Sequence, residues 1–306
     1  MTQMKIDKTE QGTIAKRKNH TVPKGLLKRW MVSENGTEGF WVLDCALGTV
    51  RFVAGANATF AIRDYRYVPI RQRDGQQPFR DDDVEEWFAD DENYLALITD
   101  HIQAGTLKKA KPAAIEGFIR ACIMLAYRSW YEYDQVEKQI RLQEPKLDES
   151  EAARRTVEAF RTMYQSHWRH FRNWDYTVVT GLQEPLLVCD RPGFDMTARD
   201  IDTLLVPLTP DSFLLGEPPE DSTRQTLTLR VAPAVSGTAV ATGGLNHITL
   251  HRAREFIVGS EVRLRAIAPE FSSEKFAARI ATDKFVGLVA LGLELPPPPS
   301  MRRPKT

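Results

Sequence analysis

The chain has 306 residues, 42% of them hydrophobic and 27% charged, which is the balance of a folded globular protein and excludes a disordered or fibrous one. Its 41 basic and 41 acidic side chains cancel, so the composition does not indicate a basic nucleic-acid binder. The three cysteines, Cys45, Cys122 and Cys189, stand far apart. They predict reduced thiols in a cytoplasmic protein, without a disulfide framework or a cysteine zinc site.

The two ends of the chain differ from its middle. We expect a disordered basic N-terminus over residues 1–15, a single α+β domain over 16–295 and a Pro-rich basic tail over 296–306. The start is polar and carries no secretory signal. The longest apolar run, 285–295, is interrupted by Gly and Glu and is too short to cross a bilayer, so we expect no membrane partner.

The first predicted elements are strands. Residues 39–44 and 48–54 are strand-like runs on either side of a short loop, which predicts a β-hairpin. Residues 61–69 add a further short strand. A helical part follows over about 81–175, and its first helix runs from about 81 to 104.

Two longer helices are predicted after this first one. Apolar side chains recur at helical spacing from Pro112 through Ile140, which predicts one continuous helix. The next helix begins at Asp148, because Glu151 three residues later completes a capping-box pattern. We expect these two helices to pack as an antiparallel pair across a short loop with Pro145.

The strand-rich part, about 176–265, follows the helices. Short apolar runs separated by Pro, Gly and Asp predict strands at 176–180, 185–189, 203–207, 212–215 and 226–231. A helix from Gly243 to about Glu255, a strand or loop over 256–260 and a last helix over 273–281 complete the pattern. Because strands and helices are segregated along the chain, the sequence predicts an α+β fold with mostly antiparallel C-terminal strands.

Several short motifs resemble, in order, those of one bacterial family known only as domain of unknown function number four thousand two hundred and thirty-eight. The matching positions are residues 19–30 with His20-Thr21-Val22-Pro23, Glu85 and Glu92, Arg128, residues 186–192, residues 204–210, Leu245-Asn246, and residues 253–260. The resemblance spans about 16–262 and implies a shared fold and positions to test, but no activity. Cys189 and Arg191 replace a Ser and an Asn of the family pattern Ser-Asp-Asn-Pro.

Two residues carry the strongest catalytic hypothesis. His20 lies in a basic stretch, and an imidazole that titrates near neutral pH can act as a general acid or base. Asp190 ends an apolar strand, where a carboxylate can position a water molecule or a metal ion. The alternatives are a histidine that orders the N-terminal segment and an aspartate that serves only the turn at residues 190–193.

Further candidates complete this hypothesis. Glu92 and Asn246 join His20 and Asp190 as catalytic candidates, and Lys24, Arg128 and Arg191 are candidate substrate-binding residues. Glu85 shares a helix face with Glu92, and with His20 and Asp190 they form a candidate metal or acid–base site. Many acidic residues surround the two glutamates, which favours a solvated acidic face. A divalent metal ion is the only cofactor that this hypothesis involves.

Two histidine pairs have spacings that allow metal binding from one helix face. They are His167 with His170 and His247 with His251. Neither pair includes the glutamate of a His-Glu-x-x-His zinc helix, which favours structural or surface histidines.

Phosphate-binding loops of ATPases, the dinucleotide-binding glycine motif and the Gly-x-Ser-x-Gly elbow of hydrolases are absent from the sequence. The leading hypothesis is a phosphodiesterase or nuclease-like hydrolase, a toxin or defence effector in which His20 and Asp190 act on a nucleic acid. The alternatives are a non-catalytic binding or scaffold protein with a protein partner, and a sensor that binds a small molecule between the helical and strand-rich parts.

Overall fold

The computed structural model describes residues 18–20, 22–64, 70–71, 79–80, 83–127, 129–195, 202–220, 226–235 and 238–271. The predictions for residues 1–15, 273–281 and 296–306 lie outside these ranges. No helix in the described part of the chain is long and apolar enough to cross a membrane.

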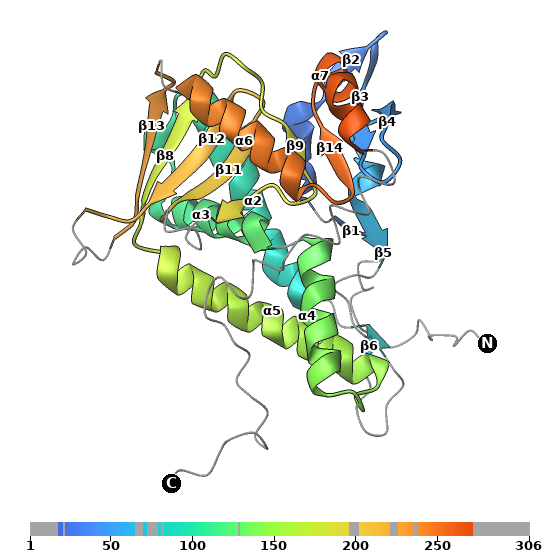
Figure 1. Cartoon of the computed structure of the whole chain (residues 1–306). Coiled ribbons are helices and arrows are strands. Elements are labelled where there is room, and N and C mark those ends of the chain that lie inside the picture. Colours follow the sequence, from blue (N-terminus) through green and yellow to red (C-terminus); the bar gives the residue numbers. More distant parts are fainter. Residues whose placement is uncertain are drawn as a thin grey trace.

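A five-stranded sheet forms the centre of the molecule (Figure 1). Its order is β10-β11-β12-β8-β13, antiparallel except that β13 runs parallel to β8. The bounds are β8 (Asp175–Thr180), β10 (Phe194–Asp195), β11 (Leu204–Thr209), β12 (Ser212–Glu217) and β13 (Thr228–Pro233). The predicted mostly antiparallel C-terminal strands are therefore confirmed.

A second sheet contains the predicted N-terminal hairpin. Its strands are β2 (Val32–Glu34), β3 (Thr37–Asp44), β4 (Thr49–Ala54), β9 (Val188–Cys189) and β14 (Phe256–Val258). β3 and β4 are the expected hairpin, and β14 joins β3 to β9. The sequence analysis missed β2, although Asn35-Gly36 takes positive φ angles of 49° and 77° in the turn to β3, as a tight hairpin turn requires.

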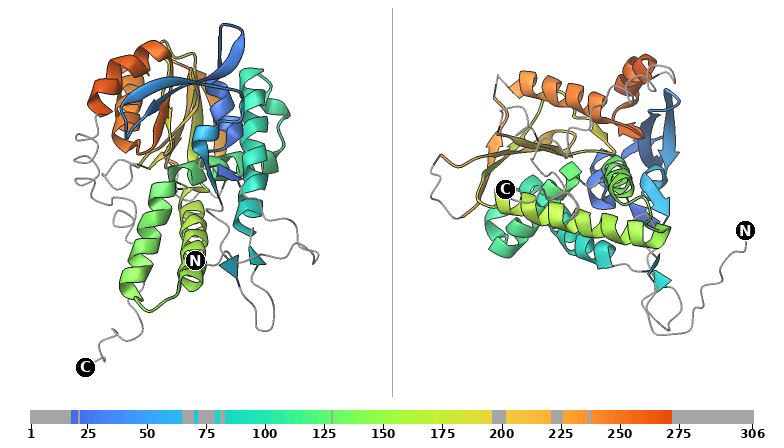
Figure 2. Two further views of the ribbon diagram at one scale, coloured as in Figure 1. Left: turned by 90° about the vertical axis from the view of Figure 1, so that its right-hand side faces the viewer. Right: turned by 60° about the horizontal axis from the view of Figure 1, so that its bottom comes forward.

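The helical part consists of α2 (Asp83–Gln103), α3 (Pro112–Tyr127), α4 (Trp130–Gln143) and α5 (Glu149–Phe171). The predicted continuous helix from Pro112 through Ile140 is wrong, because Ser129 starts a new helix by accepting a 3.0 Å hydrogen bond from the Glu132 N–H. Asp148 caps α5 as predicted, through the Glu151 N–H at 2.8 Å. α4 and α5 contact each other and run in opposite senses as expected, and Figures 1 and 2 show their axes crossing obliquely.

The remaining elements are short apart from one helix. They are β1 (Lys18–His20), α1 (Lys24–Leu27), η1 (Lys28–Trp30), η2 (Thr59–Ala61), β5 (Ile62–Asp64), β6 (Ile70–Arg71), β7 (Phe79–Arg80), η3 (Leu107–Lys109), α6 (Thr238–Arg252), α7 (Glu261–Ile267) and η5 (Ala268–Phe271). α6 begins five residues before the predicted Gly243. β1 pairs with β5, and β6 pairs with β7.

One hydrophobic core joins the central sheet to the helices. α3 is its middle, since every residue from Ala121 to Tyr127 is buried. α6 and α2 lie on opposite sides of the central strands (Figure 2). A smaller core lies under α7, where Leu43, Leu187, Ile257 and Phe271 meet. Residues of both five-stranded sheets contribute to the larger core, and the predicted α+β fold class is confirmed.

Candidate functional site

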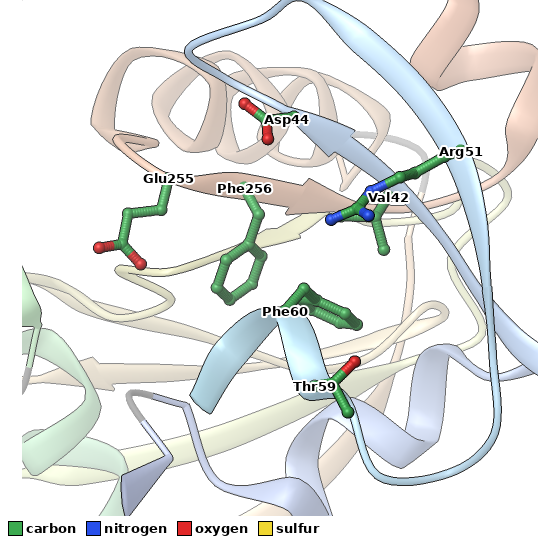
Figure 3. A pocket seen from close by; sticks show the side chains of 7 residues that line it. All are labelled: Val42, Asp44, Arg51, Thr59, Phe60, Glu255 and Phe256. Atoms are coloured by element: carbon green, nitrogen blue, oxygen red, sulfur yellow. The ribbon is translucent and has the colours of Figure 1, made fainter. Parts of the chain in front are cut away.

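A cavity of about 240 Å³ opens between β3, β4, η2 and β14 (Figure 3). Its lining residues are Val42, Asp44, Arg51, Thr59, Phe60, Glu255 and Phe256. The hairpin register explains this grouping, because Val42 pairs with Arg51 across β3–β4. Asp44 lies two residues along the same face and pairs with Phe256 of β14.

The floor of the cavity is aromatic. The rings of Phe60 and Phe256 meet edge to face, with centroids 4.9 Å apart, and Phe40 supports Phe60 from the core at 5.5 Å. In Figure 3 the guanidinium of Arg51 extends toward these rings from one side, and the carboxylate of Glu255 lies on the other side of Phe256. The cavity therefore combines an apolar surface with two opposite charges held apart.

Backbone hydrogen bonds fix the two carboxylate-bearing segments. Asp44 Oδ1 accepts bonds from the N–H groups of Ala46 and Leu47, at 3.0 and 3.1 Å, so one of its oxygens belongs to the β3–β4 turn. The Glu255 carbonyl accepts a 3.0 Å bond from the Cys45 N–H. These contacts hold the backbones of Asp44 and Glu255 beside each other.

Asp190 is hydrogen-bonded to the backbone of one residue that lines this cavity. Its Oδ1 accepts hydrogen bonds from the backbone N–H groups of Arg254 at 2.9 Å and Glu255 at 3.1 Å. The side chain is buried, and burial raises the pKa of its carboxyl group against the opposing effect of these N–H donors. Asp190 therefore positions the backbone of Glu255, a cavity residue, and its catalytic role stays a prediction.

His20 and Lys24 are linked to the residues on either side of the η2 segment that lines the cavity. His20 pairs with Ile62 in the β1–β5 ladder, and Ile62 directly follows the η2 residues that line the cavity. Lys24 Nζ donates a 2.8 Å hydrogen bond to the Asn57 side chain, two residues before Thr59. The structure describes the backbone of His20 but not its side chain, so proximity of its imidazole to Asp190 stays a prediction. Arg128 lies outside the described residues.

Arg191 belongs to a cluster of three charged side chains, which we call the arginine cluster: Arg191 and Glu132, which are buried, and Arg252, which is partly buried. Arg191 forms an ion pair with Glu132, and Arg252 lies 4.0 Å from the same carboxylate and donates to the Ala126 carbonyl at 3.3 Å. Burial, and then repulsion from Arg191, lower the pKa of Arg252 to about 10. The predicted substrate-binding role of Arg191 remains untested, and its partner Glu132 gives it a structural role.

The remaining candidates lie in helices away from the cavity lining. Glu85 and Glu92 are both in α2, and Glu92 is partly buried. Asp91 is a buried carboxylate of α2, and it binds Arg120 of α3 at 2.8 Å and the Tyr164 hydroxyl of α5 at 3.0 Å. The structure therefore ties three helices together through Asp91, which the sequence analysis counted only as part of an acidic face.

The family-like motifs meet at the segment that leads into β9. Trp30 Nε1 of the opening motif donates to the Leu186 carbonyl at 2.9 Å. Asn246 of the closing motif accepts a bond from the Leu187 N–H and donates to the Pro185 carbonyl. Trp30 and Asn246 thus connect the opening and closing motifs to the backbone of residues 185–187, just before β9.

No group of three or more His, Cys, Asp or Glu side chains suited to a metal ion occurs among the described residues. The sequence analysis missed Asp44, Arg51 and Glu255. For Asp44 and Arg51 the hairpin itself was a usable signal, since cross-strand pairing places them on one face. No sequence pattern indicates that Glu255 lines the cavity, because its backbone is held by Asp190, which is distant in the sequence.

Comparison with curated proteins finds no match, and comparison with solved structures finds none either. A family described as "Protein of unknown function (DUF4238)" matches residues 18–262, which is most of the chain. The resemblance of the motifs is thereby confirmed, and the chain belongs to the DUF4238 family.

Proposed function

We propose that the protein is a non-catalytic sensor that binds a small zwitterion, an α-amino acid, in the cavity between β3, β4, η2 and β14. One observation carries this proposal: opposite charges, on Arg51 and Glu255, flank an aromatic floor in a single cavity (Figure 3). Arg51 binds the ligand carboxylate, Glu255 binds the ammonium group, and Phe60 and Phe256 contact the side chain.

The size and charge of the cavity support a small ligand of this kind. A volume of about 240 Å³ is below the range of about 300–1,000 Å³ for drug-sized ligands. The lining carries two carboxylates, of Asp44 and Glu255, and one guanidinium, of Arg51. This net negative charge repels a polyanion in the absence of a cation, whereas the two signs of charge suit a molecule with one ammonium and one carboxylate group. The ligand lies against the hairpin sheet and not, as the sequence analysis expected of a sensor, between the helical and strand-rich parts.

The test is calorimetric titration of the purified chain with a panel of amino acids, after a screen by thermal unfolding. We expect one saturable site. Arg51→Gln and Glu255→Gln each weaken binding at least tenfold, because a hydrogen bond to a charged group contributes about 1.5–3 kcal/mol and about 1.4 kcal/mol is a factor of ten. The matched control is Lys138→Gln, on the exposed surface of α4, which keeps wild-type affinity.

Two results overturn this proposal. One is the absence of binding by every amino acid at about 10 mM, a concentration that would detect even very weak sites. The other is binding that both cavity variants and the Lys138 control retain equally.

A phosphodiesterase or nuclease-like hydrolase is the second candidate, and a specific observation favours it. β5, the strand that pairs with the His20 strand β1, directly follows the cavity-lining η2, and Asp190 holds the backbone of the cavity residue Glu255. In this candidate Arg51 binds the phosphate, His20 transfers a proton, and Glu255 takes the water-positioning role that the sequence analysis gave to Asp190.

DNA and RNA substrates, incubated with and without Mg²⁺ or Mn²⁺, test the second candidate. Hydrolysis that falls by at least a hundredfold in both His20→Ala and Glu255→Gln supports it, since general acid–base groups contribute typically 10²–10⁴-fold. Equal turnover by wild type and His20→Ala removes it, as does the absence of any turnover.

A further inference from the structure

Two exposed histidines of α6 form a close pair. His247 and His251 are one helical turn apart, and their Nε2 atoms lie 3.0 Å from each other. The ring centroids are 4.3 Å apart, and the ring planes meet at 71°. The pair is separate from the cavity described above, whose lining includes neither residue.

The distance between the two nitrogens fits one metal ion. Imidazole nitrogens bind a first-row divalent ion at about 2.0–2.1 Å, so two nitrogens 3.0 Å apart subtend about 95° at the ion. That angle matches adjacent ligand positions in octahedral or tetragonal geometry. We propose that His247 and His251 bind one divalent transition-metal ion, such as Ni²⁺, Cu²⁺ or Zn²⁺, through their Nε2 atoms.

The local charges permit a cation at this place. The pair is near the C-terminal end of α6, where the backbone carbonyl groups carry the negative end of the helix dipole. Arg252 follows His251 in sequence, but its guanidinium is turned inward, over the Phe194 ring and toward the Ala126 carbonyl. The Arg254 guanidinium donates to the carbonyl of His251, so it offsets part of that negative charge, and the imidazoles supply the binding energy.

The site is an open one. Within the described part of the chain no third His, Cys, Asp or Glu completes a metal-binding group. Water molecules therefore fill the other coordination positions, in contrast to a closed structural zinc site with four protein ligands. Such an ion exchanges freely, and the fold does not depend on it.

The other histidine pair differs in a way that provides a control. His167 is buried and stacks on Tyr127 with ring centroids 3.6 Å apart, whereas His170 packs edge to face against Trp174. These contacts direct the two rings into separate environments. His170→Ala therefore removes an exposed histidine from a helix without removing a metal ligand.

The experiment titrates NiCl₂, CuCl₂ and ZnCl₂ into chelator-treated, untagged full-length protein by calorimetry. We expect one equivalent of metal, with affinity highest for Cu²⁺ in the usual order for nitrogen ligands. His247→Ala and His251→Ala each lower the affinity at least tenfold, while His170→Ala leaves it unchanged. Electron paramagnetic resonance of the Cu²⁺ form shows two nitrogen ligands in the wild type and one in each pair variant.

Three outcomes overturn the proposal: no stoichiometric binding, affinity that survives both pair variants, or affinity lost in His170→Ala. Circular dichroism of each variant separates loss of metal binding from loss of folding. We expect unchanged spectra, since both imidazoles of the pair are exposed.

Discussion

The side-chain oxygen of Asn246, on α6, accepts a 2.8 Å hydrogen bond from the backbone N–H of Leu187. The amide nitrogen of the same side chain donates to the Pro185 carbonyl at 3.2 Å. Asn246 is buried and thus joins α6 to the segment that enters β9 at Val188. This structural role explains why an asparagine stands at this place in the closing motif.

Replacing Asn246 by Leu keeps a similar volume and removes both hydrogen bonds. The Leu187 N–H then remains buried without an acceptor, so we expect the free energy of unfolding to fall by about 2–4 kcal/mol. Urea denaturation measures this change. A fall below about 0.5 kcal/mol, with binding or hydrolysis abolished, would instead support the predicted catalytic role of Asn246.

Two glycines of α6 are positions where a substitution is expected to stabilise the protein. A Cβ atom at Gly243 or Gly244 meets nothing within 4 Å, and both residues are exposed in α6. Gly243→Ala and Gly244→Ala each raise the free energy of unfolding by about 0.5–1 kcal/mol, because alanine loses less backbone entropy in a helix. Thermal and urea unfolding both measure this gain.

Gly193 is the contrasting position for this test. A Cβ atom there comes within 2.5 Å of the Ala126 backbone nitrogen, and α3 is too deeply buried to move away. Gly193→Ala therefore lowers the free energy of unfolding by about 1–3 kcal/mol. Stabilisation at Gly193, or destabilisation at Gly243, would contradict the packing described for α6 and α3.

The arginine cluster predicts different results for its two guanidinium groups. Arg191→Met leaves the buried Glu132 carboxylate without its close partner and lowers the free energy of unfolding by about 3–5 kcal/mol. The positive charge of Arg252 is already disfavoured by burial and by repulsion from Arg191. Arg252→Met therefore changes the free energy of unfolding by no more than about 1 kcal/mol. Denaturant unfolding of both variants at neutral pH, compared with Glu132→Gln, measures the difference.

Local patterns predicted most elements of the fold, because they depend on neighbours in sequence. The hairpin at 39–54, the cap at Asp148 and the strands after Tyr176 follow from spacing and turn residues alone. The break between α3 and α4 was missed although Ser129 and Glu132 carry a capping box, since the apolar spacing continues across it.

The candidate site was less predictable, because long-range contacts assemble it. Asp190 was selected as a strand-end carboxylate, yet its oxygen binds the backbone 64 residues later and leaves the cavity to Glu255. Nothing in a single sequence indicates which strand β14 will pair with, and that pairing sets Phe256 beside Asp44. Periodicity assigns faces within an element but not partners between elements.

The first turns of α5 give a prediction for the dependence of stability on pH. Ion pairs with Arg154 and then Arg155 hold the pKa of Glu151 at about 2, below its ordinary value of 4.5. Because the folded-state pKa is the lower one, the stabilisation is present above about pH 4.5 and is lost as the pH falls toward 2. The carboxylate is 35% exposed, so solvent screening limits the contribution to about 0.5–1 kcal/mol. Urea unfolding of wild type and Glu151→Gln at pH 7 and at pH 2.5 measures this contribution. We expect the free energy of unfolding of the variant to be lower than that of wild type at pH 7, and the two values to be nearly equal at pH 2.5. The same difference in free energy at both pH values would contradict the ion pairing.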